Sequence, residues 1–169
     1  MELVSRILDG SIPYNSRGEP LGPSYFGGRI SQDDRITRLE EVSLLQGCSR
    51  KQLRKIAKIS EVLEVPADTV LARTGAAGND FFLILDGHAR VEVSSRKRSR
   101  LGPGQYFGEM SLLDGGPRSA SVVAETPLRM LVIKRRDFTT LLNEAPELTQ
   151  SILETLSRRL RLAEATVND

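Results

Sequence analysis

The sequence predicts a mainly β domain with helices at both of its ends. Between residues 61 and 133, short apolar or alternating runs are separated by glycine and proline turns, which is typical of a sandwich, roll or barrel. On either side of this region, apolar residues recur every three or four positions and predict helices. A length of 169 residues, with 39% hydrophobic residues, is enough for one such domain with a compact core.

The first part of the chain differs from the rest. Residues 1–31 are interrupted by many glycines and prolines, so we expect an arm or linker there. The start lacks the apolar run of a secretion signal, and nowhere do 18 apolar residues follow one another. The single cysteine, Cys48, fits a reducing compartment. We therefore expect a cytoplasmic chain that does not contact a membrane.

Two helices are expected before the β region. Over residues 33–45 the apolar side chains are spaced by three, and Gly47 is a suitable end for that helix. Ser49 is then the expected N-cap of a second helix, Arg50 to Ile59.

Six short runs in the β region are interpreted as strands. They are Glu61 to Val65, Val70 to Ala72, Phe81 to Leu85, Ala89 to Val93, Ser121 to Ala124 and Leu128 to Ile133. Asp86 and Gly87 form a strong hairpin signal between the third and fourth runs. The basic residues within 96–100 fall where the next turn is expected, and we interpret them as a solvated turn.

Helical spacing returns after the strands. One helix is predicted over residues 135–143, and Pro146 breaks it. From Glu147 onward an amphipathic helix of about 18 residues is expected. Its apolar face consists of Leu148, Ile152, Leu156 and Leu160.

The stretch from Phe107 to Ser121 carries residue types that suit a sugar phosphate. Gly108 permits a close approach of the backbone, and Glu109 beside it is a fixed acceptor for a diol. Residues 111–113 could form one helical turn whose free N–H groups point at an anion. Arg118 supplies a planar charged fork for phosphate oxygens. On residue types alone, a surface turn with an incidental Glu–Arg pair stays an equal alternative.

This stretch resembles the phosphate-binding cassette of the cyclic-nucleotide-binding family, which includes catabolite activators and regulatory subunits of cyclic-AMP-dependent kinases. Phe107 to Leu112 and Arg118 to Ala120 match the family pattern in register. The similarity extends from about Leu39 to Leu162. It implies an eight-stranded, jelly-roll-like β-roll with N-terminal helices over residues 32–145, and a long C-terminal hinge or lid helix over residues 146–169.

The resemblance also implies roles for individual residues. Glu109 would accept a hydrogen bond from the ribose 2′-hydroxyl, Arg118 would pair with the phosphate oxygens, and Ser119 would donate to the phosphate. Backbone N–H groups around Met110 and Ser111 would complete the anion site. The implied ligand-binding residues are Phe107, Gly108, Glu109, Met110, Ser111, Arg118, Ser119 and Ala120, with Val91 against the purine.

The base-binding end departs from the family pattern. Ala163 and Glu164 occupy the positions where the catabolite activator has a Thr-Ser pair that reaches adenine. Arg158 and Arg159 remain candidates for capping the purine. Ser119, where threonine is the alternative, favours cyclic AMP by resemblance, while cyclic GMP stays open.

Three functions remain for this chain. It could be a regulatory sensor that acts on a partner protein through movement of the C-terminal helix, or the ligand-binding part of a Crp/Fnr-type DNA-binding regulator whose helix-turn-helix is not in this chain. It could also be a degenerate domain that binds no nucleotide. An enzyme and a metal site are disfavoured because His88 is the only histidine and no catalytic triad or phosphate loop is present. We expect no direct contact with nucleic acid, and a homodimer through the C-terminal helix stays open.

Overall fold

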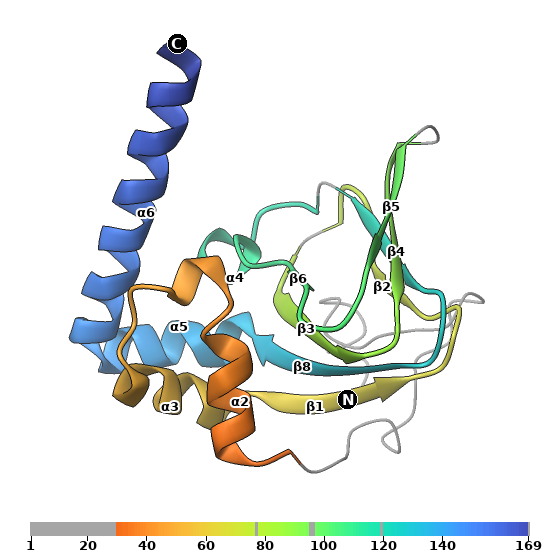
Figure 1. The fold of residues 1–169 in the computed structure, drawn as a ribbon, viewed down its shortest axis with the longest axis horizontal. Coiled ribbons are helices and arrows are strands. Elements are labelled where there is room, and N and C mark those ends of the chain that lie inside the picture. The colour runs from red at the N-terminus through yellow and green to blue at the C-terminus, as the bar shows by residue number, and fades with distance from the viewer. Residues whose placement is uncertain (1–29, 77, 95–96, 119, 169) are drawn as a thin grey trace.

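The computed structural model describes residues 30–76, 78–94, 97–118 and 120–168. Its eight strands form two four-stranded antiparallel sheets, with helices before and after them (Figure 1). This confirms the predicted eight-stranded β-roll with N-terminal helices and a long C-terminal helix. The arm expected over residues 1–31 lies almost entirely outside the described residues.

The two sheets pair strands that are distant in the sequence. The first has the order β1-β8-β3-β6, with β1 Glu61–Val65, β8 Leu128–Lys134, β3 Asp80–Asp86 and β6 Tyr106–Phe107. The second has the order β2-β7-β4-β5, with β2 Val70–Ala72, β7 Ser121–Ala124, β4 Ala89–Ser94 and β5 Lys97–Leu101. Strand β6, just before residues 108–120, therefore belongs to the first sheet, and strand β7, just after them, belongs to the second.

Strand β3 is buried on both faces, which explains its unbroken apolar sequence. Phe81 and Leu83 belong to a core that the first sheet shares with the helices. Phe82 and Ile84 belong to a second core between the two sheets. The period of two along the strand thus divides one apolar run between two layers.

The N-terminal helices differ in part from the prediction. The single helix predicted over residues 33–45 is wrong: α2 spans Gln32–Leu39, and a separate 3-10 turn, η2, spans Ser43–Leu45. Between them Val42 is extended and buried, because the turn lets it reach the core. Helix α3, Arg50–Ile59, is as predicted, and Ser49 and its third helical residue form a capping box.

The basic run within residues 96–100 was interpreted as a turn, and this is wrong for its described part. Residues 97–101 form strand β5, which pairs antiparallel with β4 and puts Ser99 opposite Val91. An edge strand exposes one side to water, so charged residues fit it and mask the strand pattern. Strand β6 was missed because it has only two residues.

The C-terminal helices follow the prediction closely. Helix α5 spans Arg135–Glu144, and α6 spans Pro146–Asn168, five residues longer than the expected 18 or so. Leu148 and Ile152 are buried, but Leu160 is 61% exposed, so the predicted apolar face is only partly covered. Figure 1 shows why: the second half of α6 projects beyond the rest of the domain.

Candidate functional site

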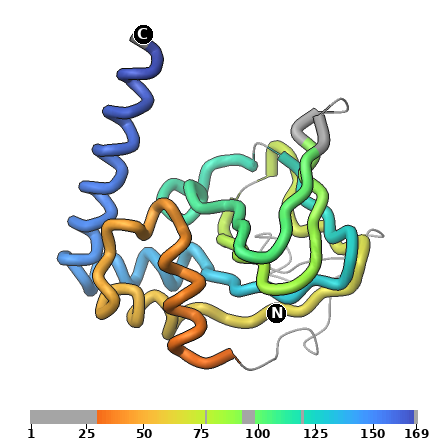
Figure 2. Tube along the Cα trace, in the orientation of Figure 1, coloured from red at the N-terminus to blue at the C-terminus, as the bar shows by residue number. Residues whose placement is uncertain are grey.

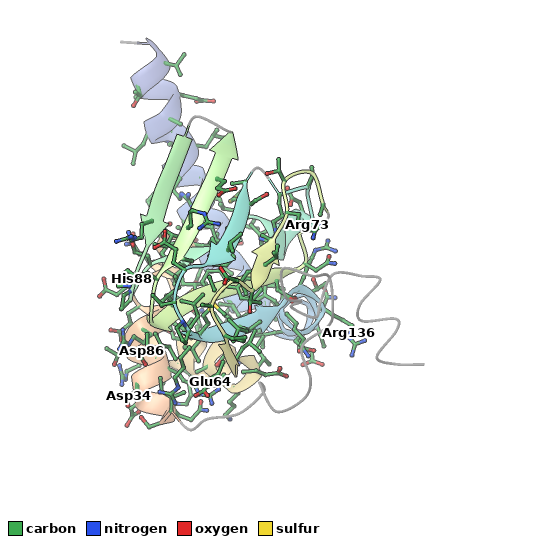
Figure 3. All side chains as sticks on the ribbon, turned by 90° about the vertical axis from the view of Figure 1, so that its right-hand side faces the viewer. Asp34, Glu64, Arg73, Asp86, His88 and Arg136 are labelled. Atoms are coloured by element: carbon green, nitrogen blue, oxygen red, sulfur yellow. The ribbon has the colours of Figure 1, made fainter. Side chains whose placement is uncertain are left out.

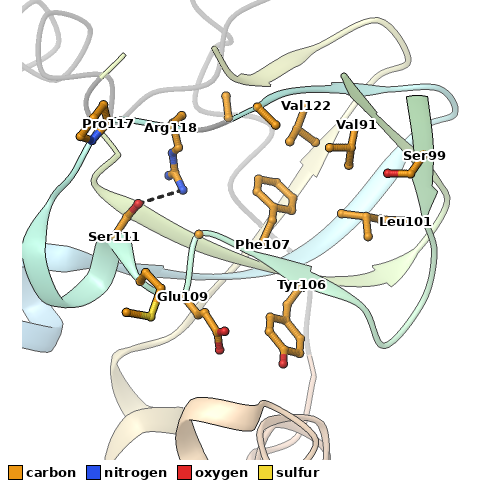
Figure 4. Close-up of a pocket in the computed structure, with 14 residues that line it drawn as sticks. Val91, Ser99, Leu101, Tyr106, Phe107, Glu109, Ser111, Pro117, Arg118 and Val122 are labelled. Carbon is orange, nitrogen blue, oxygen red and sulfur yellow. Dashed lines mark hydrogen bonds between the residues drawn. The ribbon is translucent and has the colours of Figure 1, made fainter. Parts of the chain in front are cut away.

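A cavity of about 480 Å³ lies between the second sheet and the segment from Tyr106 to Arg118 (Figure 4). Eight of the nine ligand-binding residues predicted from the sequence line it, namely Val91, Phe107, Gly108, Glu109, Met110, Ser111, Arg118 and Ala120. The ninth, Ser119, lies outside the described residues. The cavity wall therefore joins strand β4 to a segment that is distant from it in the sequence.

The Arg118 side chain is held in place at one end of this cavity. Its guanidinium donates to the backbone oxygen of Asp80 and, at 3.4 Å, to Ser111 Oγ. Its backbone exchanges two hydrogen bonds of 2.8 Å with the loop containing Gly75 and Ala76. Burial lowers the pKa of Arg118, and the charge of Asp80 acts in the opposite direction. The cavity thus contains a partly desolvated cation that is oriented before any ligand arrives.

Two glycines make room for this guanidinium. Gly108 has a φ of +84°, and a Cβ there would collide with Arg118 Nη1. A Cβ on Gly78 would collide with Ser111 Oγ and would lie 2.8 Å from Arg118 Nε. A larger residue at either position would displace the Arg118 side chain. The other atoms near the two glycines belong to the backbone or to the short side chain of Ser111, and these have less freedom to move.

A short helix follows the glycine at the cavity. Helix α4 spans Ser111–Asp114 and ends at Gly115, which adopts the left-handed conformation with a φ of +63°. The predicted helical turn over residues 111–113 is therefore present. It positions the Ser111 hydroxyl against Arg118, and that hydroxyl belongs to a residue with only 9% exposure.

Glu109 lines the cavity, but its carboxylate is turned toward the helices (Figure 4). Its Oε2 accepts from Ser43 Oγ at 3.2 Å, and its Oε1 accepts from Arg159 Nη2 at 3.2 Å. Tyr106 supports Ser43: its hydroxyl accepts from the Ser43 N–H at 3.1 Å and donates to Ser43 Oγ at 3.0 Å. One carboxylate therefore connects the cavity to both η2 and α6.

Neither arginine that was predicted to cap a base lines the cavity. Arg159 contacts Glu109 instead, and its Nη1 is buried without a hydrogen-bond partner among the described residues. Arg158 donates to Thr155 Oγ1 on its own helix at 3.3 Å. Arg159 of α6 therefore contacts the carboxylate of a cavity-lining residue, Glu109, and base capping by these arginines stays a prediction.

The other end of the cavity is apolar. The Phe107 ring stacks on Phe82 with centroids 4.8 Å apart and an interplanar angle of 18°. Val91 and Val122, on adjacent strands, and Leu101 extend this wall. Flat apolar surface next to a fixed cation suits a planar base that is attached to an anion.

Sequence reasoning missed several residues of this site. Ser43 and Gly78 lie far from the cassette in the sequence, and no local pattern marks either as part of a site. Tyr106 immediately precedes Phe107, so its position was a signal that could have been used. Leu101 was hidden because its strand was interpreted as a turn.

Other site chemistries find little support in the described ranges. Within them no three histidine, cysteine, aspartate or glutamate side chains group to hold a metal. His88 is exposed at the β3–β4 turn (Figure 3). Burial raises the pKa of the Cys48 thiol to about 11, so it is a poor nucleophile at neutral pH. No described helix is both long and apolar enough to cross a membrane.

Comparison with known proteins agrees with this geometry. Residues 62–145 match the model of the family described as cyclic nucleotide-binding domain. The chain carries a domain of this family. The matched range includes both sheets and the whole segment from Gly108 to Ala120, so the family assignment covers the cavity itself.

Several relatives share this cyclic nucleotide-binding domain. A cyclic nucleotide-gated potassium channel from Mesorhizobium japonicum is 36% identical over 125 residues, which are 73% of this chain and 35% of the channel. A cyclic AMP receptor protein from Thermus thermophilus is 38% identical over 95 residues, 53% of this chain and 44% of that protein. This chain thus spans less than half the length of these relatives.

A solved structure has the same cyclic nucleotide-binding fold over most of its length. It is the N-terminal domain of a transcriptional regulator from Streptomyces coelicolor, with a TM-score of 0.66 and 25% identity. The match covers 75% of this chain and 94% of that domain. The similarity therefore includes flanking helices as well as the roll.

Proposed function

We propose that this chain senses a cyclic purine nucleotide, cyclic AMP before cyclic GMP, by binding it in the cavity beside Arg118. The observation that carries the proposal is the Arg118 guanidinium, held by Asp80 and Ser111 at one end of a cavity whose other end is apolar. A partly desolvated cation costs free energy unless an anion compensates it. The exocyclic phosphate oxygens supply that charge, and Ser119 and the nearby amides supply further donors.

The apolar end of the cavity fits the remainder of this ligand. Val91 packs against the purine, and Phe107 and Ala120 complete the surroundings of the sugar and phosphate. Gly108 lets the backbone approach the ribose, and Met110 and Ser111 begin the helical turn beside the phosphate. The role is one of binding and signalling rather than catalysis, as in the family. The preference for cyclic AMP over cyclic GMP as the ligand rests on Ser119.

We propose that the Glu109–Arg159 contact connects ligand binding to the position of α6. The ribose 2′-hydroxyl donates to the Glu109 carboxylate, whose two oxygens already accept from Arg159 and Ser43. Ligand and α6 therefore compete for one carboxylate. Nucleotide binding weakens the Arg159 contact and shifts α6 toward other positions, and by reciprocity a displaced α6 strengthens nucleotide binding.

We also propose that the exposed part of α6 pairs with the same helix of a second copy. The predicted apolar face of α6 includes Leu148 and Ile152, which are buried in the core of the domain and cannot contact a second copy. A set that keeps Leu156 and Leu160 recurs at alternating spacings of three and four along the helix, namely Leu153, Leu156, Leu160, Ala163 and Val167. This is the heptad pattern of a coiled-coil seam. Leu156 is partly buried against the domain core, whereas Leu153, Leu160 and Val167 are exposed.

Charge placement supports a parallel arrangement of the two copies. With Leu153 at position a, Arg159 falls at g and Glu164 at the e position five residues later. Such g and e positions face each other between parallel helices, where opposite charges pair. Arg159 would then exchange Glu109 for Glu164 of the second copy when nucleotide arrives.

A larger regulator is the second candidate context. The Thermus and Streptomyces relatives are a cyclic AMP receptor protein and part of a transcriptional regulator, and this chain covers 44% of the former. The same sensor could therefore control a DNA-binding segment or another effector through α6. Whether the controlled partner is a protein or a DNA-binding segment, its control depends on the same nucleotide site.

A thermal-shift assay tests the nucleotide site directly. We expect cyclic AMP to raise the melting temperature of the chain more than cyclic GMP, and linear 5′-AMP to raise it least. A ligand at about 100 times its Kd stabilises the folded state by about 2.7 kcal/mol, which is readily seen. An unchanged melting temperature with all three nucleotides would identify a degenerate domain and refute the proposal.

A further inference from the structure

The exposed face of helix α3 carries only basic charges. Its apolar residues Leu53, Ile56 and Ala57 are at most 3% exposed and belong to the helix-side core. Its five basic residues are all exposed, and the helix contains no acidic residue. We call these five residues the α3 basic face: Arg50, Lys51, Arg54, Lys55 and Lys58.

Most of these charges do not stabilise the helix that carries them, and only Lys58, in the last turn, is favoured by the helix dipole. Arg50 and Lys51 lie in the first turn, where the helix dipole disfavours cations. Like charges are also placed four residues apart three times, at 50 and 54, 51 and 55, and 54 and 58, and each such pair is unfavourable. The capping box and the buried side chains hold α3 in place without them. The basic face is therefore an electrostatic cost in the isolated domain.

The structure shows which groups this face attracts. Arg50 Nη1 lies 2.9 Å from Glu40 Oε1, and Arg50 Nη2 lies 3.8 Å from Asp33 Oδ1. Among the residues that the structure describes, no carboxylate forms an ion pair with Lys51 or the three basic residues after it. Within the described part of the chain, carboxylates thus neutralise one end of the face, and the other four cations remain available to an external partner.

The four remaining cations form a single stripe. Lys51, Arg54, Lys55 and Lys58 are spaced as i, i+3, i+4 and i+7, so they lie on one side of the helix over about 10 Å. A partner helix with carboxylates at the same spacing would meet all four. A membrane is a poorer match, because the apolar side of α3 is buried and offers nothing for insertion.

The α3 basic face also lies beside the helix that we propose to move. Ser151 Oγ on α6 donates to Gln52 Oε1 on α3 at 3.2 Å. Figure 2 shows α3 beside the first turns of α6, at the end of the molecule away from the β4–β5 hairpin. A partner on this face would contact the domain next to the first turns of α6.

We propose that the α3 basic face docks an acidic helical segment of an effector protein. The proposal names the partner class of the sensor and in that respect rests on the proposed function. The docking contact itself consists of Lys51, Arg54, Lys55 and Lys58 with carboxylates, and needs no nucleotide. Flexible lysine side chains on this stripe can adjust to carboxylates of differing lengths.

The test uses the full chain without nucleotide and a synthetic helical peptide of about 18 residues, with glutamates at the i, i+3, i+4 and i+7 positions of an alanine background. We expect NMR shifts at residues 50–59. We also expect about tenfold weaker binding for Lys51→Gln/Lys55→Gln/Lys58→Gln, the loss of three exposed ion pairs. The control variant Arg38→Gln/Arg136→Gln/Arg161→Gln removes the same charge elsewhere and should bind the peptide within about twofold of the unmodified chain.

Two results would overturn this proposal. One is equal peptide binding by both triple variants, because the attraction would then be a property of net charge. The other is that phosphatidylserine vesicles or a DNA duplex bind the chain more tightly than the peptide does, and that this binding is lost in the α3 triple variant but not in the control variant. Since nucleotide is absent throughout, failure of this test is distinguishable from failure of the nucleotide site.

Discussion

Replacing Arg159 by glutamine distinguishes two opposite roles for this side chain, which are competition with the ligand for Glu109 and capping of the purine. In the structure it binds the carboxylate that we assign to the ribose, at 3.2 Å, with Glu109 16% and Arg159 40% exposed. A charged hydrogen bond with one partner this exposed contributes about 1 kcal/mol. If ligand and Arg159 compete for Glu109, Arg159→Gln should bind cyclic AMP about fivefold more tightly, since 1.4 kcal/mol is tenfold.

Calorimetric titration of cyclic AMP measures this change, and Arg161→Gln on the same helix is the matched control. The unliganded Arg159→Gln variant should also lose amide exchange protection in the second half of α6, because its contact with the roll is gone. A lower affinity in Arg159→Gln would refute the competition and favour purine capping by Arg159. An unchanged affinity would show that the contact has no connection to the ligand.

Three further changes test other parts of the account. Gly108→Ala should abolish detectable cyclic AMP binding by calorimetry and lower stability by about 1 kcal/mol or more, because a Cβ at a φ of +84° meets the Arg118 guanidinium; normal binding would contradict the assigned geometry. Leu83→Ala should cost about 2–5 kcal/mol in urea unfolding, because Leu83 is fully buried between the first sheet and the helices. A loss below about 1 kcal/mol would contradict that packing. Because folding raises the Cys48 pKa from 9.0 to about 11, the unfolded chain loses this proton first, so stability should fall as pH rises between those values. Cys48→Ser should flatten that slope in urea titrations at several pH values, and an identical slope would assign it to other groups.

The sequence predicted the architecture well where its signals are local. The apolar run of β3 and the Ser49 cap each act through neighbouring residues, and the structure confirms them. The hairpin predicted at Asp86 and Gly87 is wrong: the chain does turn there, but β3 and β4 belong to different sheets and do not pair. The alternation of apolar and polar residues did not distinguish a sandwich, a roll and a barrel. The family resemblance of the segment from Phe107 to Ser121 then implied the eight-stranded roll. The β5 strand was missed because edge strands tolerate charge.

The site was less accessible to sequence reasoning, since its key contacts join distant segments. The cassette placed Arg118 and Gly108 near each other, but Ser43 is 66 positions from the carboxylate that it contacts. No pattern within α6 shows that Arg159 meets Glu109 rather than a base. Such contacts depend on how α6 and η2 pack on the roll, and only the folded chain shows that.

The central claim is that Arg118 binds the phosphate of a cyclic nucleotide in the cavity. Calorimetric titration of cyclic AMP into the unmodified chain, Arg118→Gln and the exposed control Arg136→Gln tests it most directly. We expect about 100-fold weaker binding for Arg118→Gln alone, from the loss of a buried charge-assisted contact of about 3 kcal/mol. Equal affinities for all three proteins would contradict the claim.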